Sequence, residues 1–336
     1  MIWRRLLRSV LSARSIRRLQ SFFSALLEDQ ERVFITQVKR PTFTAAIDTR
    51  SDPFLSDADT AVVIQGPLAL ENHFTLNSVL LYRQHYPEAE IIVSTWNGQS
   101  PEELRSIEKA GAKVVLSELP AYSGISNTNY QIVSTRAGIE AARASGKGYV
   151  LKTRTDQRFY APSSLEFLHH LIRKFPVTGN WRQKCRIVGH SLGTFKYRLY
   201  GISDMFLFGS ADDMFEYWQC PLDDRRLADM PRADDVYKHS FLRVCEVYFC
   251  TEYLRRLGRE LRWTLADSYA AFADHFVVAN SADFDLHWPK YGRAERKWST
   301  YELAPAFQQL DFREWLNIHS RPDRKSPGLD AVMSSP

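Results

Sequence analysis

The sequence predicts an α/β fold in which a mainly parallel sheet is flanked by helices within a single domain, residues 59–300. Segments with strand and helix patterns alternate between residues 60 and 158. The strand segments are continuous apolar runs, which is typical of parallel strands that are buried on both faces. With 336 residues, 44% hydrophobic and 25% charged, the chain is long enough for one large α/β domain.

Each element of this pattern has its own signal. In chain order we expect a strand at 60–67, a helix at 73–87, a strand at 89–98, a helix at 100–112, a strand at 112–120, a helix at 127–146 and a strand at 148–158. Pro87 ends the first helix, and Gly146 ends the third. Ser100 and Glu103 form a capping-box pattern that begins the second helix. Ligands of such sheets bind beyond the carboxyl ends of the strands, so we expect the chemistry there.

Residues 1–27 form a basic, amphipathic amino-terminal segment. The formal charge of the chain is +5, and the arginines that precede its first acid, Glu28, are Arg4, Arg5, Arg8, Arg14, Arg17 and Arg18. Helical spacing predicts two short helices, one over 2–11 and one after residue 15, whose apolar faces oppose the arginines. Either the segment lies on an anionic membrane surface, or it packs on the protein itself with its arginines in water.

The remaining composition of the chain limits the class of protein it can be. Residues 28–58 are expected to be a linker, and residues 301–336 a carboxy-terminal helix followed by a disordered tail. No run of about 18 apolar residues occurs, so we expect no transmembrane helix. Without the first arginines the charge is near neutral, which argues against a nucleic-acid partner. The cysteines lack CxxC spacing, which predicts reduced thiols in a cytoplasmic protein. If residues 1–27 bind the membrane, we expect the protein to be peripheral on the inner face of the cytoplasmic membrane. They are Cys185, Cys220, Cys245 and Cys250.

Charged residues gather where the fourth expected strand ends, in the stretch KTRTDQR. Lys152, Arg154 and Arg158 surround a single acid, Asp156. A carboxylate among bases suits a phosphorylated substrate, because the acid can hold Mg²⁺ or Mn²⁺ on a diphosphate while the bases neutralise the remaining charge. The alternative is a strand end with solvated ion pairs.

Several segments, in a fixed order, carry a resemblance to a known family. They are VVIQGP, EIIVSTW, TNYQIVSTRAG, YVLKTRTDQRFY and YGISDMFLFGSADDM, with a weaker match at CEVYF. Over residues 58–290 the chain resembles the WavE-type family associated with lipopolysaccharide core synthesis. That family is thought to be similar to GT-A glycosyltransferases, whose α/β fold binds nucleotide-diphospho-sugars. The resemblance implies a GT-A-like glycosyltransferase that uses a nucleotide-sugar donor and a glycan or glycolipid acceptor, such as lipopolysaccharide core or another cell-surface glycan.

The resemblance places Asp156 where GT-A enzymes carry the Asp-x-Asp motif that binds a divalent metal, Mn²⁺ or Mg²⁺. This chain departs from the motif, because position 154 is Arg and only one acid is present, which puts the metal in question. Arg154 or Lys152 can instead neutralise the leaving diphosphate, as cations do in metal-independent transferases. A further metal ligand late in the chain is expected at His287, with His275 as the second choice. Either histidine can also be a hydrogen-bonded structural residue.

The resemblance also implies residues for the donor and for the transfer step. Those expected to bind the nucleotide sugar are Gln65, Gly66, Pro67, Trp96, Asn129, Gln131, Arg136, Lys152, Arg154 and Arg158. Trp96 can stack on a base or simply pack, and Asn129 can be a helix cap. An inverting transfer needs a base that takes the proton of the acceptor hydroxyl, and the candidates are Glu246 in CEVYF and Asp204 in GISDMF.

Residues 189–193, GHSLG, match the G-x-S-x-G pattern of serine hydrolases, which would make Ser191 a nucleophile. That pattern requires a following helix of small residues. Here Phe195, Tyr197 and Leu199 alternate with polar residues, which predicts a strand instead. A serine hydrolase is therefore a minor alternative, and a non-catalytic nucleotide- or glycan-binding protein of the same fold is another.

Overall fold

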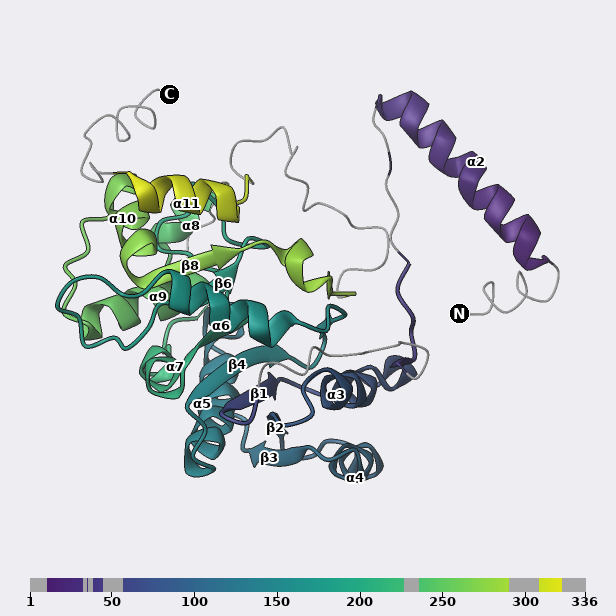
Figure 1. Ribbon diagram of the computed structural model, residues 1–336, viewed down its shortest axis with the longest axis horizontal. Helices are drawn as coiled ribbons and strands as arrows, with labels where there is room; N and C mark the ends of the chain where they lie inside the picture. Colours follow the sequence, from purple (N-terminus) through teal and green to yellow (C-terminus); the bar gives the residue numbers. More distant parts are fainter. Residues whose placement is uncertain are drawn as a thin grey trace. The chain divides into compact units, whose positions relative to one another are not determined.

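A seven-stranded sheet has the order β3-β2-β1-β4-β7-β6-β8 among the residues that the structure describes (Figure 1). Its strands are β1 Thr60–Gln65, β2 Glu90–Trp96, β3 Lys113–Ser117, β4 Tyr149–Arg154, β6 Ile187–His190, β7 Leu207–Ser210 and β8 Phe276–Ala279. Strands β3, β2, β1 and β4 run parallel to one another, and β6 runs parallel to β8. Strand β7 runs antiparallel to both of its neighbours, β4 and β6. A second sheet pairs β5 Arg158–Phe159 with β9 Leu286–His287.

The structure is a computed structural model that describes residues 11–32, 35, 39–44, 57–226, 236–289 and 308–321. It falls into two units, Met1–Pro41 and Thr42–Pro336, and both sheets belong to the second. Three expected segments lie mostly outside the described residues. They are the first helix at 2–11, the linker at 28–58 and the tail after residue 321.

Helices cover both faces of the main sheet (Figure 1). Those of the second unit are α3 Phe74–His85, α4 Pro101–Lys109, α5 Thr128–Ala144, α6 Ser164–Lys174, α7 Ala211–Trp218, α8 Val236–Phe241, α9 Cys245–Arg256, α10 Leu265–His275 and α11 Phe312–Ser320, with short 3-10 helices η2 Glu71–His73, η3 Ile125–Asn127 and η5 Ser281–Phe284. On one face, the hydroxyl of Ser94 in β2 donates to the carbonyl oxygen of Ser134 in α5, at 2.6 Å. On the other face, the Thr60 hydroxyl of β1 lies 3.0 Å from the His169 ring of α6. The predicted α/β class, with helices flanking a mainly parallel sheet, is confirmed.

The central strands are buried because both of their faces carry apolar side chains. Every residue of β1 is buried, and so are the residues of β2 after Glu90. The expected helices at 73–87, 100–112 and 127–146 correspond to α3, α4 and α5. The Ser100 side chain caps α4 as predicted, but the Glu103 carboxylate does not complete the capping box, because its Oε2 lies 3.0 Å from the His73 ring. The continuous apolar runs therefore identified the parallel half of the sheet.

The strand expected after residue 193 does not form, and that prediction was wrong. Residues 194–200 make successive turns, in which Phe195 forms only an isolated bridge to Gln309. The guanidinium of Arg198 explains the turns, because it donates to the main-chain oxygens of Gly193 and Gly201 and so closes this segment on itself.

The first unit contains one described helix, α2 Ala13–Glu31, which continues past the expected segment boundary at residue 27. The side chain of Ser12 caps it by accepting a hydrogen bond from the Ser15 amide, at 3.1 Å. Arg32 ends it in the left-handed conformation, with φ 53°. No helix in the described part of the chain combines the length and the apolar character needed to cross a bilayer.

Candidate ligand site at the carboxyl edge of the sheet

The direction of β7 brings a distant acid to the end of β4. Because β7 runs antiparallel to β4, with Lys152 opposite Leu207, the start of β7 lies at the carboxyl end of β4. Asp204 comes shortly before β7 and therefore lies at the same edge as Asp156. The topology thus assembles, at the expected ligand edge, two acids that are 48 positions apart in the sequence.

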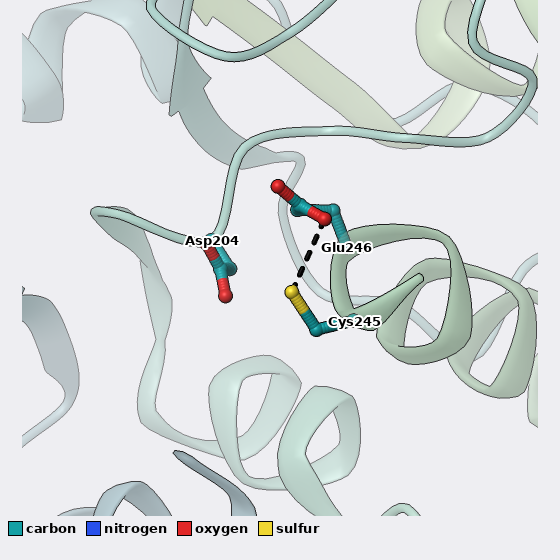
Figure 2. Close-up of side chains that lie close together, drawn as sticks. All are labelled: Asp204, Cys245 and Glu246. Carbon is teal, nitrogen blue, oxygen red and sulfur yellow. Dashed lines mark hydrogen bonds between the residues drawn. The ribbon is translucent and has the colours of Figure 1, made fainter. Parts of the chain in front are cut away.

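Helix α9 adds Cys245 and Glu246 from its first turn (Figure 2). One ligand atom from each of Asp204, Cys245 and Glu246 lies within 4.8 Å of the others. The Cys245 thiol donates to Glu246 Oε2 at 3.1 Å. Asp204 is only 5% exposed, and its Oδ2 has no hydrogen-bond partner within the described ranges. The structure therefore brings together both residues predicted as the base, and adds Cys245, which the sequence analysis had placed only among reduced thiols.

Cations surround this group of carboxylates. The ammonium of Lys152 is fully buried and donates to the main-chain oxygen of Asp204. Burial lowers the pKa of Lys152 to about 8, and the charge of Asp204 partly opposes that shift. Arg198 Nη1 lies 3.3 Å from Glu246 Oε1. Three separate segments therefore supply two acids and two cations at this edge, and of these four Glu246 alone is partly exposed.

Arg154 and Asp156 form a close pair at the end of β4. Arg154 Nε and Nη2 donate to the two oxygens of Asp156 at 2.8 and 3.1 Å, and Trp288 Nε1 donates to Asp156 Oδ2 at 3.1 Å. Burial disfavours the charged form of Arg154, but the hydrogen bond and charge of Asp156 outweigh it and raise the pKa of the guanidinium. Since both carboxylate oxygens already accept hydrogen bonds, this geometry does not favour Asp156 as the metal ligand that the resemblance implied.

Of the three grouped side chains, Asp204 is the one whose carboxylate suits a hard divalent cation. Asp204 offers a buried carboxylate oxygen without a partner, whereas the oxygens of Glu246 are engaged by Arg198 and Cys245. Burial, and then the charge of Glu246, raise the pKa of Cys245 well above its usual value and keep the thiol protonated. Mg²⁺ and ions like it are commonly held by one or two carboxylates together with substrate phosphates and water.

Neither predicted histidine belongs to the Asp204 group in the described chain. His287 lies in β9, opposite Arg158 of β5, with its ring near those of Phe74 and Tyr160. His275 is fully buried, and its Nδ1 lies 2.9 Å from Gln183 Oε1. Burial lowers the pKa of His275 to about 3, so the ring is neutral at neutral pH.

Several buried amide groups at this edge have no hydrogen-bond partner among the described residues. Oε1 of Gln65, at the end of β1, and Oε1 of Gln131, in the first turns of α5, are buried without a hydrogen bond. Both amide atoms of Gln157, which follows Asp156, are also unpartnered. Buried polar groups are normally satisfied, so these atoms are free to bind a polar ligand. Sequence reasoning missed Gln157, although its place in KTRTDQR was a usable signal.

The turn after β1 requires glycine. Gly66 has φ +125°, and a Cβ there would lie 2.9 Å from Thr155 Oγ1. The Thr155 hydroxyl donates to the Pro67 carbonyl oxygen at 2.6 Å, and the Thr155 amide donates to the Gln65 carbonyl oxygen at 3.0 Å. The ends of β1 and β4 are therefore joined directly, which fixes the position of Gln65 relative to Arg154.

Four of the residues predicted to bind the nucleotide sugar make hydrogen bonds or ring contacts within the protein instead. Asn129 donates to the Tyr122 and Asp223 carbonyl oxygens, and Arg136 donates to those of Trp218 and Cys220. The four are Asn129, Arg136, Arg158 and Trp96. The ring of Trp96 packs edge-on against Tyr130, at 5.7 Å between centroids, and Arg158 is a buried structural cation. These four side chains contact other parts of the protein, and their role in donor binding stays a prediction.

In the described part of the chain, the Ser191 side chain hydrogen-bonds only to Ser281, which is not a base. Its hydroxyl lies 3.4 Å from the Ser281 hydroxyl and accepts from the Ser281 amide at 3.3 Å. The neighbouring His190 ring hydrogen-bonds to Ser281 and Ser203 instead. Turns, not a helix, follow GHSLG, so the geometry of a nucleophile elbow is missing from this segment.

A pocket of about 700 Å³ lies at the opposite edge of the sheet, next to Tyr149 at the start of β4. Of its three cations, Arg143 and Lys184 both pair with Asp212, and the ammonium of Lys147 donates to the Ala58 carbonyl oxygen. None of the residues gathered around Asp204 lines this pocket. The charged residues around Asp204 and this pocket are therefore two separate sites on the protein.

Fold and site together define an α/β protein with a charge-lined candidate ligand site at the carboxyl edge of its sheet. The chain belongs to the WavE lipopolysaccharide synthesis family, whose model matches residues 60–322. No curated protein matches it. Among solved structures it is similar to core-mannan synthase A from Aspergillus fumigatus in its Mn/GDP form, with 8% identity, coverage of 75% of this chain and 81% of that chain, and a TM-score of 0.34. A likeness at that TM-score carries no argument about function.

Proposed function

We propose that this protein is a glycosyltransferase that moves a sugar from a nucleotide-diphospho-sugar to lipopolysaccharide core or another cell-surface glycan. The observation that carries the proposal is the meeting of Asp204 and Glu246 with Lys152 and Arg154 at one edge of the sheet. Membership of the lipopolysaccharide synthesis family supplies the class of substrate. The cytoplasmic location inferred from four cysteines, all of them free, is part of the same proposal.

Glu246 is the better of the two candidate bases. Its side chain is 20% exposed, whereas Asp204 is buried, and a base must reach the acceptor hydroxyl. As the acceptor oxygen bonds to the anomeric carbon, its proton passes to the Glu246 carboxylate. The bond from that carbon to the diphosphate breaks, and the negative charge moves to the diphosphate. A base placed in this way serves an inverting reaction.

The leaving diphosphate needs positive charge in its neighbourhood. Arg154 retains an exposed fraction of 21% and lies at the end of β4, where it can contact the phosphates while still paired with Asp156. A divalent cation, Mn²⁺ or Mg²⁺, would be held by Asp204 and would add Lewis-acid neutralisation of the same charge. The unpartnered amides of Gln65, Gln131 and Gln157 would bind the polar groups of the donor.

The test separates binding from transfer. Glu246→Gln should keep the affinity for nucleoside diphosphates, measured by isothermal titration with UDP and GDP, and lose about 10²- to 10⁴-fold in transfer rate. Glu216→Gln is the matched control, because Glu216 also pairs with an arginine, Arg256, at 3.2 Å, but on α7. Asp204→Asn should weaken nucleotide binding in the presence of Mn²⁺ more than in the presence of a chelator. Transfer at the parent rate by Glu246→Gln would remove this mechanism.

A non-catalytic binding protein of the same fold is the second candidate. The pairing of Asp156 with Arg154 favours it, because the one acid of the expected motif is already engaged. Nucleotide binding without transfer or donor hydrolysis, for every nucleotide sugar tried, would select it. The geometry around Ser191 gives no support to the hydrolase alternative, so Ser191→Ala should keep full activity.

A further inference from the structure

Helix α2 carries a stripe of large apolar side chains that are exposed. They are Ile16, Leu19, Phe22, Phe23, Leu26 and Leu27, with exposed fractions from 41% to 58%. At about 100° per residue these side chains fall within an arc of about 140° on one side of the helix. Single exposed apolar residues are ordinary, but a continuous stripe of this size marks a surface that binds something.

The charges of α2 are arranged around this stripe. Arg14, Arg17 and Arg18 occupy the first two turns and lie outside the apolar arc, with Arg18 next to its edge at Phe22. The first turn of the helix contains no acid. Acidic residues come only at its end, where Glu28 Oε1 accepts from the Ile35 amide at 2.7 Å. The basic half of the helix follows three further arginines of the sequence, Arg4, Arg5 and Arg8.

We propose that α2 lies in the plane of an anionic lipid surface, with its apolar stripe in the acyl boundary and Arg14, Arg17 and Arg18 against the headgroup phosphates. Charge complementarity selects this occupant, because the basic half of α2 faces headgroup phosphates of opposite charge while the apolar stripe enters the acyl boundary. Long arginine stems allow the side chain to reach headgroups while the helix sinks to the depth of its apolar residues. The helix lies on the bilayer and does not cross it.

This inference goes beyond the proposed transfer reaction and does not depend on it. It applies to the first unit of the chain, whereas the ligand site belongs to the second. Binding to lipid is measured without donor or acceptor, so its failure and the failure of the transferase proposal can be told apart.

The full-length protein would be mixed with vesicles of phosphatidylcholine alone, or of phosphatidylcholine with phosphatidylglycerol, and separated by flotation. We expect binding to the anionic vesicles that weakens as salt is raised, and little binding to the neutral ones. Phe23→Glu should reduce binding roughly tenfold or more, because it puts a charge in the middle of the apolar stripe. Phe43→Glu is the matched control, since Phe43 in the second unit is also 58% exposed, and it should change nothing.

A second variant tests the charges separately. Arg17→Gln with Arg18→Gln should remove the preference for anionic vesicles while leaving the apolar stripe intact. The proposal fails if the parent protein does not float with anionic vesicles, or if Phe23→Glu floats as the parent does. It also fails if Phe23→Glu instead abolishes a dimer seen by sedimentation, or lowers the melting temperature while vesicle binding is absent, because α2 would then bind protein.

Discussion

Arg158 and Arg154 belong to the same short motif, but their surroundings differ. Arg158 is 1% exposed and donates to the Ser78 hydroxyl at 3.0 Å and the Phe74 carbonyl oxygen at 2.8 Å. It also donates to the Thr42 carbonyl oxygen and the Tyr160 hydroxyl, at 3.0 and 3.1 Å. Arg154 has one carboxylate partner and remains partly exposed. Arg158 therefore stabilises the fold, and Arg154 is available to a ligand.

Lysine substitution should separate the two roles. Arg158→Lys keeps the charge but loses the planar fork, so it should lower the free energy of unfolding by about 3 kcal/mol, measured by urea denaturation. Arg154→Lys should change it by less than about 1 kcal/mol and should weaken nucleoside diphosphate binding. If Arg158→Lys unfolds at the same urea concentration as the parent, the buried hydrogen bonds of Arg158 do not carry the stability that we assign to them.

The sequence identified this charged motif, but it did not show which of its side chains are buried and which face a ligand. Spacing placed Arg154, Asp156 and Arg158 at the end of a strand, which the structure has at that point. Whether a charged side chain turns toward solvent or into the protein depends on distant partners, such as Ser78 for Arg158 and Trp288 for Asp156. Those partners cannot be read from the motif itself.

At the scale of elements, α5 approaches the sheet closely at Gly138. A Cβ on Gly138 would lie 2.4 Å from Val63 Cγ1 and 3.0 Å from Ser94 Cβ. The same helix begins at Thr128, at the carboxyl edge, and carries Gln131 in its first turns, so its distance from the sheet determines where that amide lies. The absence of a side chain at position 138 therefore supports the geometry of the candidate site.

Gly138→Ala should be destabilising although alanine is the better helix former. The gain in helix propensity is about 1 kcal/mol, while overpacking costs about 1 to 3 kcal/mol, so we expect a net loss of roughly 1 kcal/mol in thermal or urea unfolding. Combining it with Val63→Ala should cost less than the sum of the two single changes, because the contact with Val63 Cγ1 is then removed. Strict additivity would mean that α5 moves instead.

Element prediction succeeded where the signal was long and local. The runs at β1, β2 and β4 have no good alternative to buried strands, and the Ser100 side chain caps α4. Strands β6, β7 and β8 have only four residues each, which is too short for a periodic signal. The alternation at residues 195–199 misled the prediction, because Arg198 bonds back to its own loop.

At the scale of the whole molecule, the site exists only through topology. Asp204 and Glu246 were each predicted from their local motifs, but nothing local indicated that their carboxylates would meet Cys245. The antiparallel insertion of β7 beside β4 produces that meeting. The unpartnered amide of Gln157 likewise becomes visible only when its burial is known.

Buried histidines make the stability of the whole fold sensitive to acid. His190 and His275 are fully buried, and burial lowers the pKa of each from 6.5 to about 3. The unfolded chain takes up protons below pH 6.5 while the folded protein does not, so stability falls as the pH drops from 6.5 toward 3. Each such histidine should contribute a loss of about 1.4 kcal/mol per pH unit in that window.

The measurement is urea denaturation at pH 7, 6 and 5, comparing the parent with His275→Gln. The variant should be less stable at pH 7, because it loses a packed ring beside Trp181, but its stability should decline less steeply toward pH 5. His170→Gln, on the exposed side of α6, is the control and should follow the parent at each pH. Parallel declines for the parent and His275→Gln would show that this histidine takes up its proton in the folded state, and the assignment of acid sensitivity to its burial would be withdrawn.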